Sequence, residues 1–137
     1  MTAGNGGMQM NIQELQTVLH HRLPIKMVVI DNGAYGMVRQ FQESYFEGRY
    51  PSTLWGYSAP DFVAIAQAYG IEARKVESPS EVEGGLGAMW ADPLAPFLLH
   101  VRIDTFTNVY PKIAFGRPLT EMEPFAKPIQ MEQDKPC

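Results

Sequence analysis

The sequence contains a single cysteine, lacks any cluster of basic residues, and has no apolar run long enough to span a bilayer. Cys137 is the last of 137 residues, so neither an internal disulfide nor a cysteine-based metal site can form. The 11 basic and 15 acidic residues give a net charge of −4, which argues against nucleic acid or an anionic membrane as a partner. The longest apolar stretches, such as Ile25–Ile30, fall far short of the roughly 20 residues of a membrane span. These absences predict a cytoplasmic protein of about one domain.

Helical and strand patterns alternate along the middle of the chain. Apolar residues recur every three to four positions from Met8 to Leu19, which predicts an amphipathic helix at 8–21. Residues 25–30 form a short β-branched run, typical of a strand buried on both faces of a parallel sheet. Further helices are expected at 36–46, at 62–69 with Asp61 as cap and at 80–90 with Ser80 as cap, and further strands at 71–76 and 96–103. This order predicts an α/β fold, a parallel sheet flanked by helices.

Both ends of the chain are unusual for a complete domain. Gly4, Gly6 and Gly7 crowd the N-terminus without a recognisable strand before them, although glycine-rich turns usually join a strand to a helix. We therefore expect a fold that is incomplete at its N-terminal edge. Residues 115–137 combine several prolines with polar side chains, which predicts an extended tail. The expected division is a truncated domain at 1–114 and a Pro-rich C-terminal tail at 115–137.

Two polar turns are the strongest candidates for a binding site. In open parallel sheets, ligands bind outside the carboxyl ends of the strands. The turn at residues 4–7 offers backbone N–H groups to an anion such as phosphate, and the turn at 31–34 follows the predicted strand at 25–30. One helix and one strand separate Asn5 from Asn32, so their side-chain oxygens can converge on a cation such as Mg²⁺. The alternative is that an Asn-Gly pair forms only a turn.

The same residues carry a resemblance to a known family. Gly4-Asn5-Gly6, followed by Asp31-Asn32 and by the Gly-Met-Val-Arg-Gln-Phe-Gln segment at 36–42, resembles the thiamine-diphosphate motif of the acetohydroxyacid synthase (acetolactate synthase) large subunit. The similarity covers roughly residues 3–125. It implies the C-terminal thiamine-diphosphate-binding domain, with a flavodoxin-like fold, of a multidomain enzyme. That enzyme decarboxylates a 2-keto acid such as pyruvate and ligates the two-carbon unit to a second carbonyl.

The resemblance also implies roles for individual residues. Asn5, Asn32 and the backbone carbonyl of Ala34 would hold Mg²⁺. The residues implied to contact the cofactor are Gly4, Gly6, Gly7, Met8, Gly36 and Met37. Met37 and Phe41 would border the substrate channel. No catalytic residue is expected in this chain, because the activating glutamate belongs to the N-terminal pyrimidine-binding domain of a partner subunit.

Three positions depart from the family pattern. Asn5 stands where the family has aspartate, so metal affinity should fall unless the complete site compensates. Asp31 stands where the first asparagine of the later pair often lies. Phe41 occupies the position of a tryptophan that favours the larger second substrate, which puts the preference for 2-ketobutyrate in doubt.

The resemblance implies two partners, the N-terminal pyrimidine-binding domain and a 2-keto acid substrate. It also implies that the intact enzyme is a homodimer or homotetramer and that the isolated chain is inactive. Residues 49–57 resemble a related carboligase that acts on a keto sugar in polysaccharide biosynthesis. Two further alternatives are a non-catalytic assembly module and a chain that associates with a separately encoded N-terminal half. Outside the motif, His100 is expected in the core or at an interface and not as a catalytic residue, and Glu43 is expected in solvent. The aromatic loop at 45–57 is expected equally in an interface or in internal packing.

Overall fold

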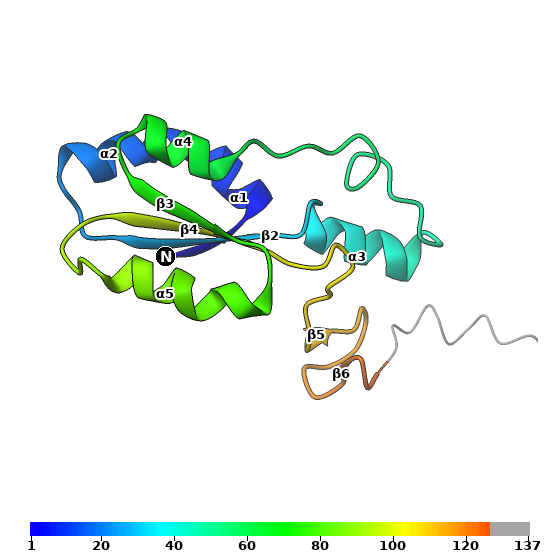
Figure 1. Ribbon diagram of the computed structural model, residues 1–137. Helices are drawn as coiled ribbons and strands as arrows, with labels where there is room; N and C mark the ends of the chain where they lie inside the picture. Colours follow the sequence, from blue (N-terminus) through cyan, green and yellow to red (C-terminus); the bar gives the residue numbers. More distant parts are fainter. Residues whose placement is uncertain (127–137) are drawn as a thin grey trace, which may run out of the picture. The chain divides into compact units, whose positions relative to one another are not determined.

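The computed structural model describes residues 1–126 of the chain. Its first compact unit, Met1–Thr107, is a parallel sheet with helices on both faces (Figure 1), and a second unit begins at Asn108. This arrangement confirms the predicted α/β class. No helix within the described range is long and apolar enough to cross a membrane.

Within Met1–Thr107, four parallel strands form the sheet in the order β1-β2-β4-β3. Their bounds are β1 Thr2–Gly4, β2 Lys26–Asp31, β3 Glu72–Val76 and β4 Phe97–Arg102. The central pair, β2 and β4, is in register from Lys26 opposite Phe97 to Asp31 opposite Arg102. The carboxyl ends of the two central strands therefore place an acidic and a basic residue side by side.

The helices divide into two layers and one outlying element. Helices α1 (Asn5–Met10), α2 (Leu15–His20) and α4 (Phe62–Ala68) cover one face of the sheet, and α5 (Val82–Trp90) covers the other (Figure 1). Helix α3 (Gly36–Tyr45) lies beyond the carboxyl end of β2. Short 3₁₀ turns precede α2 at Ile12–Glu14 and α5 at Pro79–Glu81.

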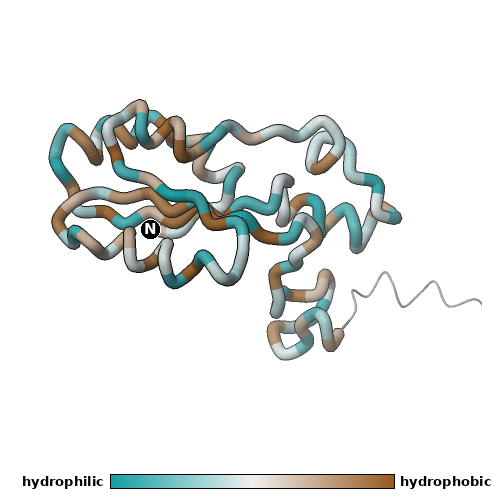
Figure 2. The backbone as a smooth tube through the Cα atoms, viewed as in Figure 1, coloured by the Kyte–Doolittle hydropathy of each residue, from teal (hydrophilic) through white to brown (hydrophobic). Residues whose placement is uncertain are grey.

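Each face of the sheet has its own apolar core, and apolar residues gather along the central strands (Figure 2). The core under α1, α2 and α4 consists of Met8, Leu15, Val18, Met27, Val29, Phe62, Ala66, Ile71 and Leu98. The core under α5 consists of Val76, Met89, Phe97 and Leu99. Strands β3 and β4 and helix α5 supply all four buried members of the second core, whereas Val28 of β2 packs only at its margin. Both Val28 and Ile30 are half-buried. The predicted burial of this strand on both faces is therefore only partly correct.

The N-terminal segment differs from the expectation in two ways. A strand does precede the glycine-rich turn, because β1 pairs in parallel with β2 along its whole length. Ala3 and Gly4 have little strand propensity of their own, so the strand depends on its hydrogen bonds to β2. The predicted helix at 8–21 is two helices, since α1 already begins at Asn5 and Asn11 leaves the helical conformation with a φ of −134°.

The remaining elements match the predicted ones closely, with one change of cap. Asp61 caps α4 as expected, accepting hydrogen bonds from the N–H groups of Val63 and Ala64. The turn before α5 begins earlier than predicted and is closed by Glu81, whose Oε2 accepts from the N–H groups of Glu77 and Ser78. The sequence Ser-Pro-Ser-Glu thus uses Ser78, three residues before Glu81, and not Ser80.

The second unit contains a short antiparallel pair, β5 (Lys112–Ile113) with β6 (Met122–Glu123). An ion pair of 3.1 Å between Lys112 Nζ and Glu123 Oε2 joins the two strands. The described part of the proline-rich segment therefore turns back on itself and is not simply extended. The domain division at 114 stays a prediction, and residues 127–137, including Cys137, lie outside the described residues.

Two glycines of α5 give a test of how closely this helix packs on the sheet. A Cβ on buried Gly85 would lie 2.7 Å from Val76 Cγ2 and 3.2 Å from Leu99 Cδ1. We expect Gly85→Ala to lower the free energy of unfolding by about 1–3 kcal/mol, because it overpacks the second core. Chemical denaturation followed by circular dichroism measures this loss.

Gly87→Ala is the matched control, two residues along the same helix. Gly87 is exposed and a Cβ there meets nothing within 4 Å. Alanine should therefore raise stability by about 0.5–1 kcal/mol through helix propensity alone. Equal effects of the two substitutions would contradict the close contact at Gly85.

Candidate functional site

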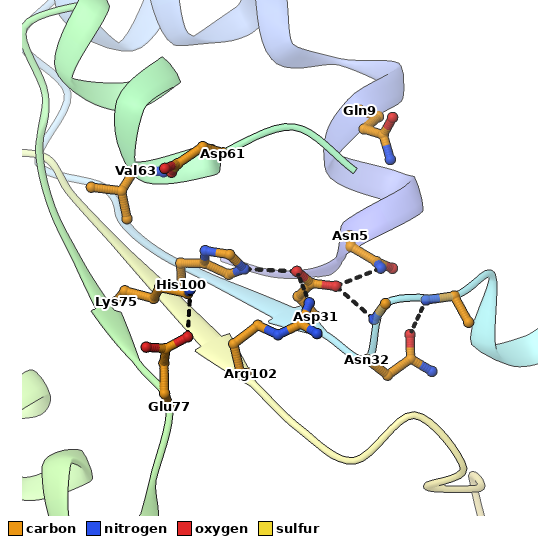
Figure 3. A network of polar contacts seen from close by, with 12 residues as sticks. Asn5, Gln9, Asp31, Asn32, Asp61, Val63, Lys75, Glu77, His100 and Arg102 are labelled. Atoms are coloured by element: carbon orange, nitrogen blue, oxygen red, sulfur yellow. Dashed lines mark hydrogen bonds and ion pairs between the residues drawn. The ribbon is translucent and has the colours of Figure 1, made fainter. Parts of the chain in front are cut away.

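The turns that follow β1 and β2 lie next to each other at the carboxyl edge of the sheet. Gly4 of β1 is in register with Ile30 of β2, so the residues that follow them meet (Figure 3). Asn5 Nδ2 donates a hydrogen bond of 2.7 Å to Asp31 Oδ1. The two turns therefore lie together as predicted, but the hydrogen bond joins Asn5 to Asp31, the residue before Asn32. The convergence of the Asn5 and Asn32 oxygens on a cation stays a prediction.

Asp31 is the polar centre of this edge, and its side chain is only 3% exposed. Its Oδ1 accepts hydrogen bonds from Asn5 and from the N–H of Gly33 at 2.8 Å. Its Oδ2 accepts from His100 Nε2 at 2.9 Å and from Arg102 Nη1 at 2.6 Å (Figure 3). A carboxylate offers about four acceptor positions. All of them are therefore used within the protein.

The environment of Asp31 keeps it ionised although it is buried. Burial by itself raises the pKa of a carboxyl group, because it disfavours the charged form. The hydrogen bonds from Gly33, His100 and Arg102, with the charge of Arg102, outweigh burial and hold the pKa of Asp31 below its usual range. The prediction that His100 is a core histidine is confirmed, since it is buried and bonded to Asp31.

Asn32 is buried, and its amide folds back onto its own turn. Asn32 Oδ1 accepts a hydrogen bond of 3.2 Å from the N–H of Ala34, which is fully buried. The amide nitrogen lies against Gly36 at the start of α3, where a Cβ would come within 2.6 Å of it. Gly36 therefore makes room for the side chain of Asn32. The predicted contact of Gly36 with the cofactor stays a prediction.

The glycine-rich turn is open at Gly4 and Gly7 and covered at Gly6. A Cβ on Gly4 or Gly7 would meet nothing within 4 Å, whereas one on Gly6 would lie 2.5 Å from the ring of Tyr35. The side chain of Met8 is buried in the core. Only the backbone of Met8 is therefore left for the predicted contact with a diphosphate.

Aromatic residues from the long loop pack over this turn. The ring of Tyr57 contacts that of Tyr35 edge to face, with centroids 4.6 Å apart. The Tyr57 hydroxyl accepts a hydrogen bond of 2.9 Å from Gln9 Nε2 of α1. Burial, with the nearby Tyr35 and Asp31, raises the pKa of Tyr57. Part of the aromatic loop thus serves internal packing, whereas Trp55 is 59% exposed.

Helix α3 presents exposed apolar side chains on one side and a buried arginine on the other. Met37 and Phe41, the predicted channel residues, are one helical turn apart and exposed by 62% and 38%. Arg39 is fully buried, forms an ion pair of 2.9 Å with Glu43, and lies 5.1 Å from the ring centroid of Phe106. Glu43 is exposed, as expected of a solvated charge, and it also balances this arginine.

The sequence reasoning missed the central role of Asp31 and its partners. Asp31 and Arg102 end two strands that were both predicted, and His100 precedes Arg102 by two residues. Residues two apart on a strand share one face. Opposite charges at the ends of two neighbouring parallel strands were thus a signal for an ion pair. The strand order that makes these two strands neighbours was not predicted.

The oxygen atoms at this edge suit a cation that arrives bound to an anion such as phosphate. The described residues contain no cluster of three or more His, Cys, Asp or Glu that could hold a metal ion. Asn5 Oδ1 accepts one hydrogen bond, from the N–H of Gly6, and Asn32 Oδ1 accepts one from Ala34. An amide oxygen has two acceptor positions, so each can also face a hard cation. These neutral ligands fit Mg²⁺ bound together with phosphate oxygens.

Comparison with known proteins identifies the domain. Residues 1–101 match the family model of the thiamine pyrophosphate enzyme, C-terminal TPP binding domain. The chain belongs to this family. Its two polar turns therefore lie in a thiamine pyrophosphate (thiamine diphosphate) binding domain.

Curated relatives of this thiamine pyrophosphate domain include acetolactate synthase large subunits. The chain is 41% identical over 120 residues to isozyme 2 of Escherichia coli K12, covering 88% of this chain and 22% of that protein. It is 37% identical over 126 residues to the protein of Porphyra purpurea, covering 92% and 21%. The chain thus spans about a fifth of the length of these relatives.

A solved structure shares the fold of the thiamine pyrophosphate domain. The thiamine diphosphate-dependent 4-hydroxybenzoylformate decarboxylase of Rhodococcus jostii RHA1 superposes with a TM-score of 0.67 and 25% identity. The match covers 75% of this chain and 19% of that one. The predicted recognition of the family is therefore confirmed, together with its fold.

Glycines in the turn of the thiamine pyrophosphate domain give a second test. Gly6→Ala should lower the free energy of unfolding by about 1 kcal/mol, because the new methyl group displaces the half-exposed Tyr35 ring from its contacts. Gly7→Ala should raise it by about 0.5–1 kcal/mol, because space is free at this exposed helical position. Thermal unfolding of the two variants measures the difference.

A Tyr35→Ala background isolates the cause. Without the ring, the loss from Gly6→Ala should disappear, since two carbons of that ring are the nearest atoms to the new Cβ from outside its own turn among the described residues. A loss that persisted in this background would refute the steric explanation.

Proposed function

We propose that this domain binds the diphosphate half of thiamine diphosphate through Mg²⁺ in an acetolactate-synthase-like carboligase. The similarity to acetolactate synthase large subunits over most of the chain carries the proposal. The placement of Asn5 and Asn32 on adjacent turns at the carboxyl ends of β1 and β2 supports it. The reaction proposed is decarboxylation of a 2-keto acid such as pyruvate and ligation of its two-carbon unit to a second carbonyl.

The residues of this chain hold and orient the cofactor in this proposal. Asn5 Oδ1, Asn32 Oδ1 and the carbonyl of Ala34 are the proposed ligands of Mg²⁺. Backbone N–H groups of the glycine-rich turn face the diphosphate, where the open space at Gly4 and Gly7 permits close approach. The bound cofactor supplies the carbon nucleophile for the reaction.

The apolar face of α3 is the proposed border of the substrate channel. Met37 and Phe41 lie on this face, and both are exposed, so a substrate or another domain can contact them in this proposal. The proposed partner is the N-terminal pyrimidine-binding domain of the same enzyme family, which supplies the activating glutamate. The proposed intact assembly is a homodimer or homotetramer, and the isolated chain is inactive in this proposal.

Calorimetric titration of the chain with thiamine diphosphate, with and without Mg²⁺, tests the proposal. We expect binding that requires Mg²⁺ and that weakens about tenfold or more, about 1.4 kcal/mol, in Asn32→Ala, because this variant removes a ligand oxygen. Asn11→Ala is the control, since Asn11 is an exposed amide next to α1. A folded chain that binds no thiamine diphosphate in the presence of Mg²⁺ would rule out a self-sufficient cofactor module.

A further inference from the structure

The hydrogen bonds of Asp31 decide which end of the Asn5 amide is available to a ligand. A carboxylate can only accept hydrogen bonds, so the amide nitrogen of Asn5 must be the end that faces Asp31 Oδ1 at 2.7 Å. The reversed amide would place two oxygens against each other at this short distance. Asn5 Oδ1 is therefore directed to the other side, where it accepts from the N–H of Gly6 at 2.9 Å.

The charges at this edge cancel before any ligand arrives. The negative charge of Asp31 is opposed by Arg102, at 2.6 Å, and all of its acceptor positions are used. No acidic side chain occurs in the rest of the two turns, residues 4–8 and 32–36. A divalent cation at Asn5 and Asn32 would meet only neutral oxygens, which bind it weakly unless other ligands supply charge.

We infer that Asn5 and Asp31 form a matched pair that keeps the cation site neutral, so that the domain takes up Mg²⁺ only as its diphosphate complex and not as the free ion. Asp31 acts as a positioning residue, because it orients the amide of Asn5 without contacting the cation. This inference rests on the proposed function for the place of the cation. The pairing of Asn5 with Asp31 rests on the hydrogen bonds alone.

The pair predicts the behaviour of an aspartate at position 5. A carboxylate there would oppose that of Asp31 at about the present 2.7 Å separation, and two like charges so close repel strongly. Asn5→Asp should lower Tm by roughly 5 °C in the absence of divalent ions. It should also gain stability from Mg²⁺ alone, because the cation then neutralises the added charge.

Thermal unfolding with Mg²⁺ alone, with inorganic diphosphate alone and with both ions tests the inference. The wild-type chain should be stabilised only by the two ions together, by roughly 5 °C. Stabilisation of the wild type by Mg²⁺ alone, to the same extent as by both ions, would overturn the inference. No stabilisation by both ions would also overturn it.

Two control variants separate charge from simple loss of contacts. Asn5→Ala removes the amide without adding charge, so it should be more stable than Asn5→Asp without divalent ions and should not respond to free Mg²⁺. Asn11→Asp adds the same charge at an exposed position, so it should neither lose stability nor gain stability from free Mg²⁺. An Asn5→Asp chain that is as stable as Asn5→Ala and insensitive to Mg²⁺ contradicts the pairing.

A double-mutant cycle tests whether the two positions are coupled. Asn5→Asp combined with Asp31→Asn restores a hydrogen bond between an amide and a carboxylate, so its loss of stability should be smaller than the sum of the single losses. Additive losses would refute a matched pair. If Asp31→Asn does not fold, the comparison of Asn5→Asp with Asn5→Ala decides alone.

The calorimetric titration with thiamine diphosphate distinguishes this inference from the proposed function. Binding of thiamine diphosphate with Mg²⁺, in a chain that also binds free Mg²⁺ tightly, would leave the proposed function intact and overturn the neutral site. Coupled stabilities of Asn5 and Asp31 without any thiamine diphosphate binding would confirm the pair and contradict the proposed function.

Discussion

The buried carboxylate of Asp31 connects the parts of the molecule on which the candidate site depends. Asp31 is the last residue of β2. Its carboxylate accepts hydrogen bonds from Asn5, the first residue of α1, and from His100 and Arg102 at the end of β4. Uncompensated charge in a protein interior costs on the order of 3 kcal/mol or more. The three elements must therefore stay together around this group. Their alignment also brings the two polar turns to one place.

Glycines at the same edge allow close approach in two different ways. Gly36 lets the amide of Asn32 lie against the first turn of α3, and Gly6 lets the Tyr35 ring cover the start of α1. Gly4 and Gly7, in contrast, have free space beside them. Some of these glycines therefore serve contacts within the protein, and others have open space beside them.

The character of the proposed site follows from an amide, Asn5, that stands beside the carboxylate of Asp31. A neutral pair of amide oxygens suits a cation that arrives with phosphate, since the phosphate oxygens carry the charge that the protein does not supply. The exposed apolar face of α3, next to this turn in the chain, has the character of a surface that meets a substrate or another domain. Both features agree with a domain that supplies one half of a cofactor site.

Local patterns in the sequence were sufficient for the elements and for the two turns. The apolar run at 25–30, the Asp61 cap and the spacing of Gly4-Asn5-Gly6 from Asp31-Asn32 depend on neighbours along the chain, so the fold class and the proximity of the two polar turns followed from them. Only the tertiary structure decided the strand character of Thr2–Gly4 and the partners of Asp31. Both arise because β2 lies between β1 and β4. Hydrogen bonds across a sheet join residues that are distant in sequence, and no local pattern encodes that order.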